Sequence, residues 1–191
     1  MSRVKASSWT ALYKLGSLVL AALALLFFFI QAGLHIYRGH PGHVLWVCTV
    51  GVAMVGFGQL RGSAILNGIG TFWLTVGLLT WLLDLTLGGE FIPTSILTHI
   101  GGLIIGYLGM RRLGLPPQTW WRAIVSMAAL LVVSRLVTPP ELNVNLVYGA
   151  YWGTSTIVSS HWWNLAIVFA IFSTSFLTLQ LGLPRIGWVR S

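Results

Sequence analysis

Long apolar runs separated by short polar turns make up almost the whole chain. A helix needs about 20 residues to cross the roughly 30 Å hydrocarbon core of a bilayer, and shorter runs suffice where polar ends reach the interface. Glycine and proline pairs mark the breaks between the runs. The pattern predicts an all-α fold: a polytopic integral membrane protein in which one domain, 1–191, forms a bundle of about six transmembrane helices near 12–36, 43–60, 64–84, 95–110, 120–137 and 162–181.

The composition favours lipid as the solvent for this apolar surface. Of the 191 residues, 56% are hydrophobic and only 7% are charged, so polar side chains are too few to cover a water-soluble domain. The basic head and apolar run at the amino-terminal end resemble a signal peptide. That run exceeds the usual 7–15 residues, and no small-residue cleavage site follows it, so we assign it to the first transmembrane helix.

Lysine and arginine are distributed unevenly between the two predicted sides. Only Arg38 and Arg135 fall on one side, and the other side carries Arg3, Lys5, Lys14, Arg61, Arg111, Arg112, Arg122, Arg185 and Arg190. The positive-inside rule then predicts a protein of the cell (inner) membrane with both chain ends in the cytoplasm. The net charge of +8 is spread between apolar runs, so we expect anionic membrane lipids and not nucleic acid as the partner.

The histidines and acidic residues gather on the opposite, outer side. All five histidines and all three acidic residues fall in the outer half or in outer loops. A rise of 1.5 Å per helical residue places Cys48, Asp84, His99 and Arg135, from four different helices, in one layer near the outer boundary. Ionisable groups at such depth are costly, and they face the bundle interior, pair with one another or mark a functional path.

These four residues form the predicted catalytic site. His99 would be the general base, Asp84 would orient its imidazole, Arg135 would bind a phosphate or an oxyanion, and Cys48 would be the nucleophile. Structural alternatives remain open: Asp84 and Arg135 as a clamp between two helices, and Cys48 as an apolar filler. Hydroxyl alternatives to the thiol at a similar depth are Thr98, Ser134 and Thr138.

A long outer segment follows the fifth run. Residues 138–161 show no clear helix, and a proline pair ends the preceding helix sharply. A loop of this length in a compact protein indicates a lid or re-entrant cover. We therefore predict that Glu141, Asn143 and Asn145 bind substrate, together with His35.

The outer histidines offer an alternative as a metal or haem site. His35, His40 and His43 lie close together in the sequence and could combine with His99 and Asp84. The proline turn at 41 prevents their spacing from falling on one helix face. We therefore predict no metal and no cofactor.

Two family resemblances bear on function. The piece Thr98-His99-Ile100-Gly101-Gly102 with Gly106 resembles the histidine helix of rhomboid proteases, but the serine motif that precedes it in that family is absent, so we reject that assignment. Most of the chain resembles the YwaF-type membrane proteins and their eukaryotic acyltransferase relatives. Cys48, His99 and the stretch 143–152 occupy places comparable to that family's polar residue, histidine and asparagine-rich aromatic segment. This resemblance implies acyl-chain or lipid chemistry.

The leading hypothesis is a lipid-directed acyltransferase or hydrolase that acts from the outer side of the membrane. The alternative is a non-catalytic helper subunit of a membrane complex, with partner membrane proteins, or a small transporter. Only Gln59, Asn67 and scattered hydroxyl side chains lie in the inner half, which counts against a path for a transported solute.

Overall fold

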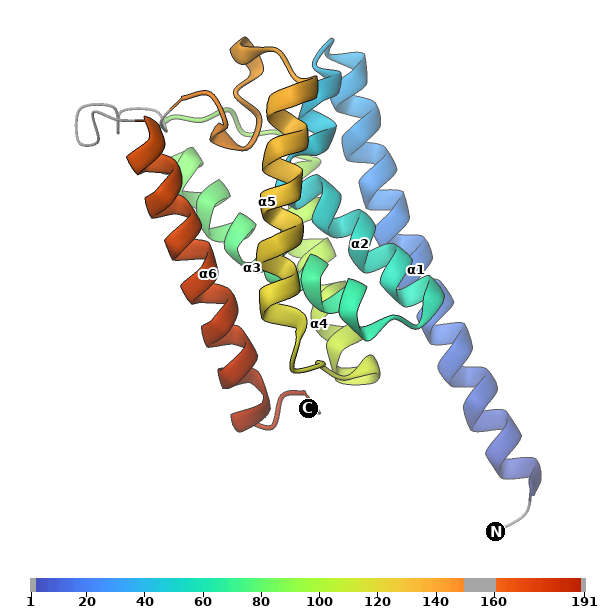
Figure 1. Ribbon diagram of the computed structural model, residues 1–191. Coiled ribbons are helices and arrows are strands. Elements are labelled where there is room, and N and C mark those ends of the chain that lie inside the picture. The colour runs from blue at the N-terminus through green and yellow to red at the C-terminus, as the bar shows by residue number, and fades with distance from the viewer. Residues whose placement is uncertain (1–2, 150–160, 190–191) are drawn as a thin grey trace.

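The structure, a computed structural model, describes residues 3–149 and 161–189, and all regular elements in those ranges are helical (Figure 1). The all-α prediction is confirmed. The long helices run alternately up and down and are α1 (Arg3–Tyr37), α2 (Val47–Arg61), α3 (Ala64–Thr86), α4 (Gly102–Leu113), α5 (Thr119–Val137) and α6 (His161–Arg185). Short helical turns are η1 (Pro41–Leu45), η2 (Leu97–Gly101), η3 (Pro140–Leu142) and η4 (Val144–Leu146).

Four segments within the described ranges are long and apolar enough to cross a membrane: Lys14–Tyr37 of α1, and the helices α3, α5 and α6. The other two predicted runs are each divided. α2 has only 15 residues because Trp46, with a ψ of 136°, separates it from the 3-10 turn η1. α4 has 12 residues and continues from η2, a turn of π-helix.

Two predicted boundaries differ in ways that the local sequence explains. α1 begins at Arg3 instead of residue 12, since neither glycine nor proline occurs before Gly16. The predicted outer loop 138–161 contains two short 3-10 turns, η3 and η4. Its stretch 150–160, on which the lid hypothesis depends, lies outside the described residues.

α3 is the central helix of the bundle. Its buried aromatic side chains Phe72 and Trp73 pack in the main apolar core, where Phe72 stacks on Phe176 of α6 with ring centroids 5.9 Å apart. The Trp73 indole also donates a hydrogen bond of 3.1 Å to the Ala123 carbonyl oxygen of α5. α3 thus positions both carboxyl-terminal helices.

Glycines bring α2, α3 and α4 into close contact. A Cβ on Gly70 of α3 would lie 2.4 Å from the Gly51 carbonyl oxygen of α2, and one on Gly106 of α4 would lie 2.4 Å from Thr71 Oγ1. Small residues at such positions let helix backbones approach one another. The glycines of α4 are therefore used inside the bundle.

Two polar layers lie at different depths in this three-helix unit. Near the amino-terminal end of α3, Gln59 Nε2 donates to Asn67 Oδ1 (2.8 Å), and Asn67 Nδ2 donates to the Gly106 carbonyl oxygen (2.9 Å). The other layer contains Cys48 and His99. The apolar side chains at intermediate positions on these helices are at most 5% exposed and are Val52, Val55, Leu74 and Ile105.

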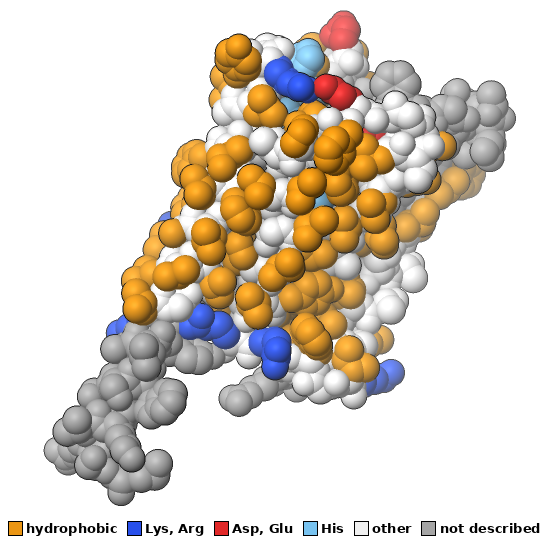
Figure 2. Space-filling model, turned by 180° about the vertical axis from the view of Figure 1, so that it is seen from behind, with side chains coloured by type: hydrophobic (Ala, Val, Ile, Leu, Met, Phe, Trp, Pro, Cys, Tyr) orange, Lys and Arg blue, Asp and Glu red, His pale blue; other side chains and the backbone are white. Residues whose placement is uncertain are grey.

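The surface has an apolar belt between two charged ends (Figure 2). Lysine and arginine side chains gather at one end, which we call the basic end; the described ones are Lys14, Arg61, Arg111, Arg112, Arg122 and Arg185. The three acidic side chains lie at the other, the acidic end, where Arg38 forms an ion pair with Glu90 at 3.0 Å. Both chain termini lie toward the basic end (Figure 1).

Candidate functional site

The imidazole of His99 is held in a fixed orientation at the start of the fourth predicted span. The residue lies in η2, and its side chain is 5% exposed. Its Nδ1–H donates a hydrogen bond of 2.9 Å to the Ser95 carbonyl oxygen. Trp81 of α3 stacks flat on the ring, with centroids 4.7 Å apart and an interplanar angle of 9°. The neutral imidazole therefore carries its proton on Nδ1, and Nε2 is the basic atom.

Cys48 is the partner of this imidazole. It is the second residue of α2, and its thiol interacts directly with the imidazole of His99. Because Nδ1 of the imidazole already donates to Ser95, Nε2 is the atom available to accept the thiol proton. On the α3 side, Gly77 lies beside Cys48, since a Cβ there would be in ordinary van der Waals contact with Cys48 Cβ at 3.5 Å. A thiol beside an oriented base has the two parts of an activated nucleophile.

A chain of buried polar side chains extends from this pair toward α1. Gln31 Nε2 donates to Ser95 Oγ at 3.4 Å and lies 3.0 Å from His35 Nε2, while its Oε1 accepts a 2.6 Å hydrogen bond from Thr94 Oγ1. Gln31, His35 and Ser95 are each at most 6% exposed. We call Gln31, His35, Thr94 and Ser95, together with Cys48 and His99, the polar cluster.

The polar cluster reaches the acidic end through a pair of histidine rings. The rings of His35 and His43 meet edge to face with centroids 5.3 Å apart, and the ring centroids of His43 and His40 are 5.1 Å apart. In the described part of the chain, however, no group of three or more His, Cys, Asp or Glu side chains could hold a metal ion. The geometry thus gives no support to the metal or haem alternative.

Asp84 and Arg135 lie apart from the cysteine–histidine pair. The Asp84 carboxylate packs against Gly89, where a Cβ would lie 2.3 Å from Asp84 Oδ2. It forms no hydrogen bond with His99 in the described structure, since the Nδ1–H of that imidazole donates to the Ser95 carbonyl oxygen. Arg135 is exposed and donates to the Val147 carbonyl oxygen at 2.5 Å, with its guanidinium 5.0 Å from the Tyr148 ring. The structure therefore assembles two of the four predicted catalytic residues.

The four residues predicted to bind substrate have different environments. His35 belongs to the polar cluster, and Glu141 is exposed at the acidic end. Asn143 and Asn145 are used internally: Asn143 Oδ1 accepts hydrogen bonds from two backbone N–H groups, of Tyr148 at 3.0 Å and of Gly149 at 2.9 Å. The two asparagines adopt a positive φ, of 39° and 55°.

Sequence reasoning missed several residues of the site. Gln31 lies within an apolar helical run, one turn before His35, and this i, i+4 pair was the signal that could have identified it. Trp81 belongs to a helix that carries several aromatic residues, so nothing singled it out as the ring that stacks on His99. Ser95 contributes through its backbone carbonyl, for which the sequence carries no signal.

No family model, curated protein or solved structure matches this chain.

Proposed function

We propose that this chain is an integral membrane protein of the cell (inner) membrane with six transmembrane segments and both ends in the cytoplasm. Support comes from the four long apolar helices, the exposed apolar belt and the concentration of basic side chains at one end. α2 with η1 and α4 with η2 would supply the two shorter crossings. Their polar ends would reach the interface of a locally thinned bilayer.

The proposed activity is transfer or hydrolysis of an acyl group drawn from a membrane lipid. The single observation that carries this proposal is the direct interaction of the Cys48 thiol with the His99 imidazole, whose Nδ1 is fixed by the Ser95 carbonyl oxygen. A thiol beside an oriented base is suited to nucleophilic attack on a carbonyl. The resemblance to acyltransferase relatives of the YwaF-type proteins implies the same chemistry.

The reaction would run in two steps. Cys48 Sγ attacks the carbonyl carbon of a lipid ester while His99 Nε2 accepts the thiol proton; the ester C–O bond then breaks, and the leaving alcohol oxygen takes that proton. Water, or a second alcohol, attacks the resulting thioester with His99 again as base. This step releases the acid or transfers the acyl group, and the thiol regains its proton.

The supporting residues divide into two groups. Ser95 takes the orienting role that the sequence assigned to Asp84, which leaves Asp84 without a part in these steps. Arg135 also has no part in these steps, because it lies apart from the reacting pair; we propose that it binds a lipid phosphate at a separate apolar groove of about 420 Å³ between α5 and α6, which also includes Trp162 and Phe169. A phospholipid whose phosphate contacts Arg135 would lie with its chains along this groove.

The test is acylation of the purified protein in phospholipid nanodiscs, with p-nitrophenyl butyrate and a phosphatidylglycerol carrying isotope-labelled chains as probes. Intact mass spectrometry should show one acyl group on the wild type, removable by hydroxylamine, and none on Cys48→Ala. His99→Ala should acylate about 10²–10⁴ times more slowly, because the base is lost. Whole-cell lipid extracts should change on deletion of the gene and stay changed when only His99→Ala is restored.

Thr174→Val provides a matched control, since Thr174 lies on the exposed face of α6 and bonds only its own helix, at 2.8 Å to the Ala170 carbonyl oxygen. It should acylate at the wild-type rate. Wild-type protein that stays unacylated, in cells whose lipid profiles do not depend on it, would exclude the enzyme. A stoichiometric partner that co-purifies from such cells would then favour the helper-subunit alternative.

A further inference from the structure

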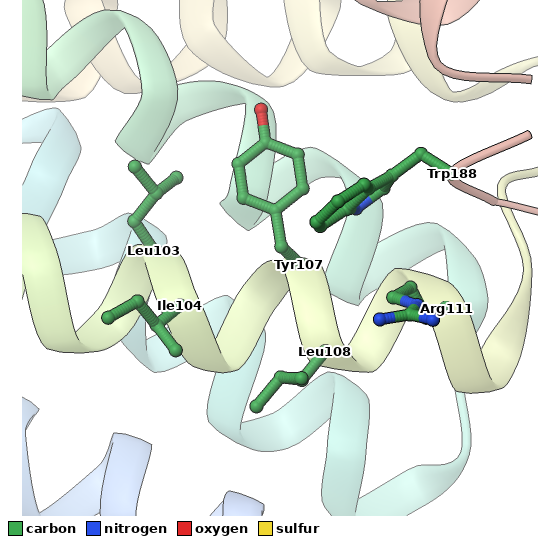
Figure 3. A pocket seen from close by; sticks show the side chains of 6 residues that line it. All are labelled: Leu103, Ile104, Tyr107, Leu108, Arg111 and Trp188. Atoms are coloured by element: carbon green, nitrogen blue, oxygen red, sulfur yellow. The ribbon is translucent and has the colours of Figure 1, made fainter. Parts of the chain in front are cut away.

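A second lipid-facing feature lies at the basic end, away from the cysteine–histidine pair. It is a pocket of about 340 Å³ on the outer face of α4, and Figure 3 shows the side chains that line it: Leu103, Ile104, Tyr107, Leu108, Arg111 and Trp188. Five of them fall at positions 0, 1, 4, 5 and 8 along one helix and so share one face. Arg111 lies about 12 Å along the axis from Leu103, at the end of the row nearer the basic end. We call this feature the α4 groove.

Two aromatic side chains that line the α4 groove are held in place by contacts with other helices. Tyr107 is tied to α3 by a hydrogen bond of 3.2 Å between its hydroxyl and Thr75 Oγ1. Trp188 follows α6 and is brought back over α4 by a turn at Gly187, whose φ is 68°. The backbone N–H of Trp188 donates to the Leu183 carbonyl oxygen at 3.2 Å, and the next residue, Val189, is buried in the main core. The indole meets the Tyr107 ring edge to face at 6.4 Å.

Arg111 gives the groove a cation, and none of the chain's acidic side chains lies near enough to pair with it. Its guanidinium lies 5.2 Å from the Trp188 ring, and it donates no hydrogen bond within the described part of the chain. All three acidic side chains lie at the opposite end of the molecule. An arginine in this setting presents a planar set of N–H donors that matches phosphate oxygens.

We propose that the α4 groove binds an anionic phospholipid from the leaflet at the basic end, with its phosphate on Arg111 and one acyl chain along Leu108, Ile104 and Leu103. The polarity of the groove fits this occupant, because the cation lies at the interface and the apolar wall runs toward the middle of the belt. Trp188 lies between the two parts, where an indole is suited to the headgroup boundary. This site is separate from the proposed acyl-transfer chemistry and holds whether or not that reaction occurs.

The test is lipid retention by the full chain in nanodiscs of equal amounts of phosphatidylglycerol and phosphatidylcholine, followed by release into mild detergent and native mass spectrometry. The wild type should retain one phosphatidylglycerol in preference to phosphatidylcholine. Arg111→Gln should retain about tenfold less, as expected for the loss of a charge-assisted hydrogen bond. Leu108→Trp, which keeps the cation and fills the apolar wall, should also lower retention.

Arg122→Gln is the matched control. Arg122 lies at the same end on α5, but it is engaged with Gln118 Oε1 at 2.7 Å and with the Trp121 ring at 5.4 Å. It should retain the wild-type amount. The proposal is overturned by equal losses in the two arginine variants, which would indicate general attraction to the basic end, by equal retention of both lipids, or by unchanged retention in both Arg111→Gln and Leu108→Trp.

Discussion

Gly70→Ala is expected to be among the most destabilising single changes in this protein. The new methyl group would lie 2.4 Å from the Gly51 carbonyl oxygen and 2.9 Å from the Val55 nitrogen. Both of these atoms are backbone atoms of α2, so no side-chain rotation can make room, and the two helices must separate. We expect the free energy of unfolding to fall by about 3 kcal/mol or more, the upper range for overpacking a core.

The measurement is the free energy of unfolding in mixed micelles, obtained by titration with a denaturing detergent. Gly33→Ala is the control, because a Cβ at Gly33 of α1 would meet nothing within 4 Å. That change should leave stability equal or raise it by about 0.5–1 kcal/mol, since alanine restricts the unfolded chain. Equal stability of the two variants would mean that α2 and α3 are not packed through these glycines.

Asn145→Ala is expected to release the acidic end of the bundle from α5. Asn145 Oδ1 accepts from the Val47 N–H at 2.9 Å, and its Nδ2 donates to the Leu45 carbonyl oxygen at 2.8 Å and to Ser134 Oγ at 3.0 Å. This one amide links η4, the start of α2 and α5. At about 1 kcal/mol for each hydrogen bond, the expected loss is about 3 kcal/mol, and strain at a positive φ adds to it.

The variant should also expose the neighbouring thiol. Cys48 directly follows Val47, so loss of the Val47 hydrogen bond should allow the first turn of α2 to open, and maleimide labelling of Cys48 should become several-fold faster. Asn143→Ala is the control: its amide bonds only residues 148 and 149 of its own segment. Labelling in that variant should stay near the wild-type rate; if both variants labelled equally fast, Asn145 would have no special role at α2.

The sequence predicted the helices well where packing did not interrupt them. The prediction 64–84 became Ala64–Thr86, and 120–137 became Thr119–Val137. Apolar runs locate such helices because length and hydropathy alone decide them. The π-helical turn before α4 was not predicted. It widens the helix locally around His99, and the hydrophobic pattern carries no signal for a change from one helical hydrogen-bond pattern to another.

The sequence predicted how deep the site residues lie along their helices, but not which way their side chains point around the helix axes. Counting residues placed Cys48 and His99 at one level, and in the structure their side chains interact. The same counting placed Asp84 and Arg135 at that level. A rise along the axis does not fix the angle around it, and these two side chains lie against Gly89 and Tyr148 instead. The amide of Gln31 was hidden in an apolar run, although it links His35 to Ser95.

The apolar layer of Val52, Val55, Leu74 and Ile105 has a consequence for membrane energetics. It separates the thiol and imidazole from the Gln59–Asn67 amides, which lie about three helical turns away along α2, by low-dielectric material. The hydroxyl groups of Thr71, Thr75 and Tyr107 at that depth bond to α3 carbonyl oxygens or to each other, so this three-helix unit offers few free partners to a hydrated ion or a chain of proton-conducting waters. If the proposed reaction occurs, we expect a proton released at the thiol to return to the compartment from which it came, so that turnover does not dissipate the transmembrane electrochemical gradient.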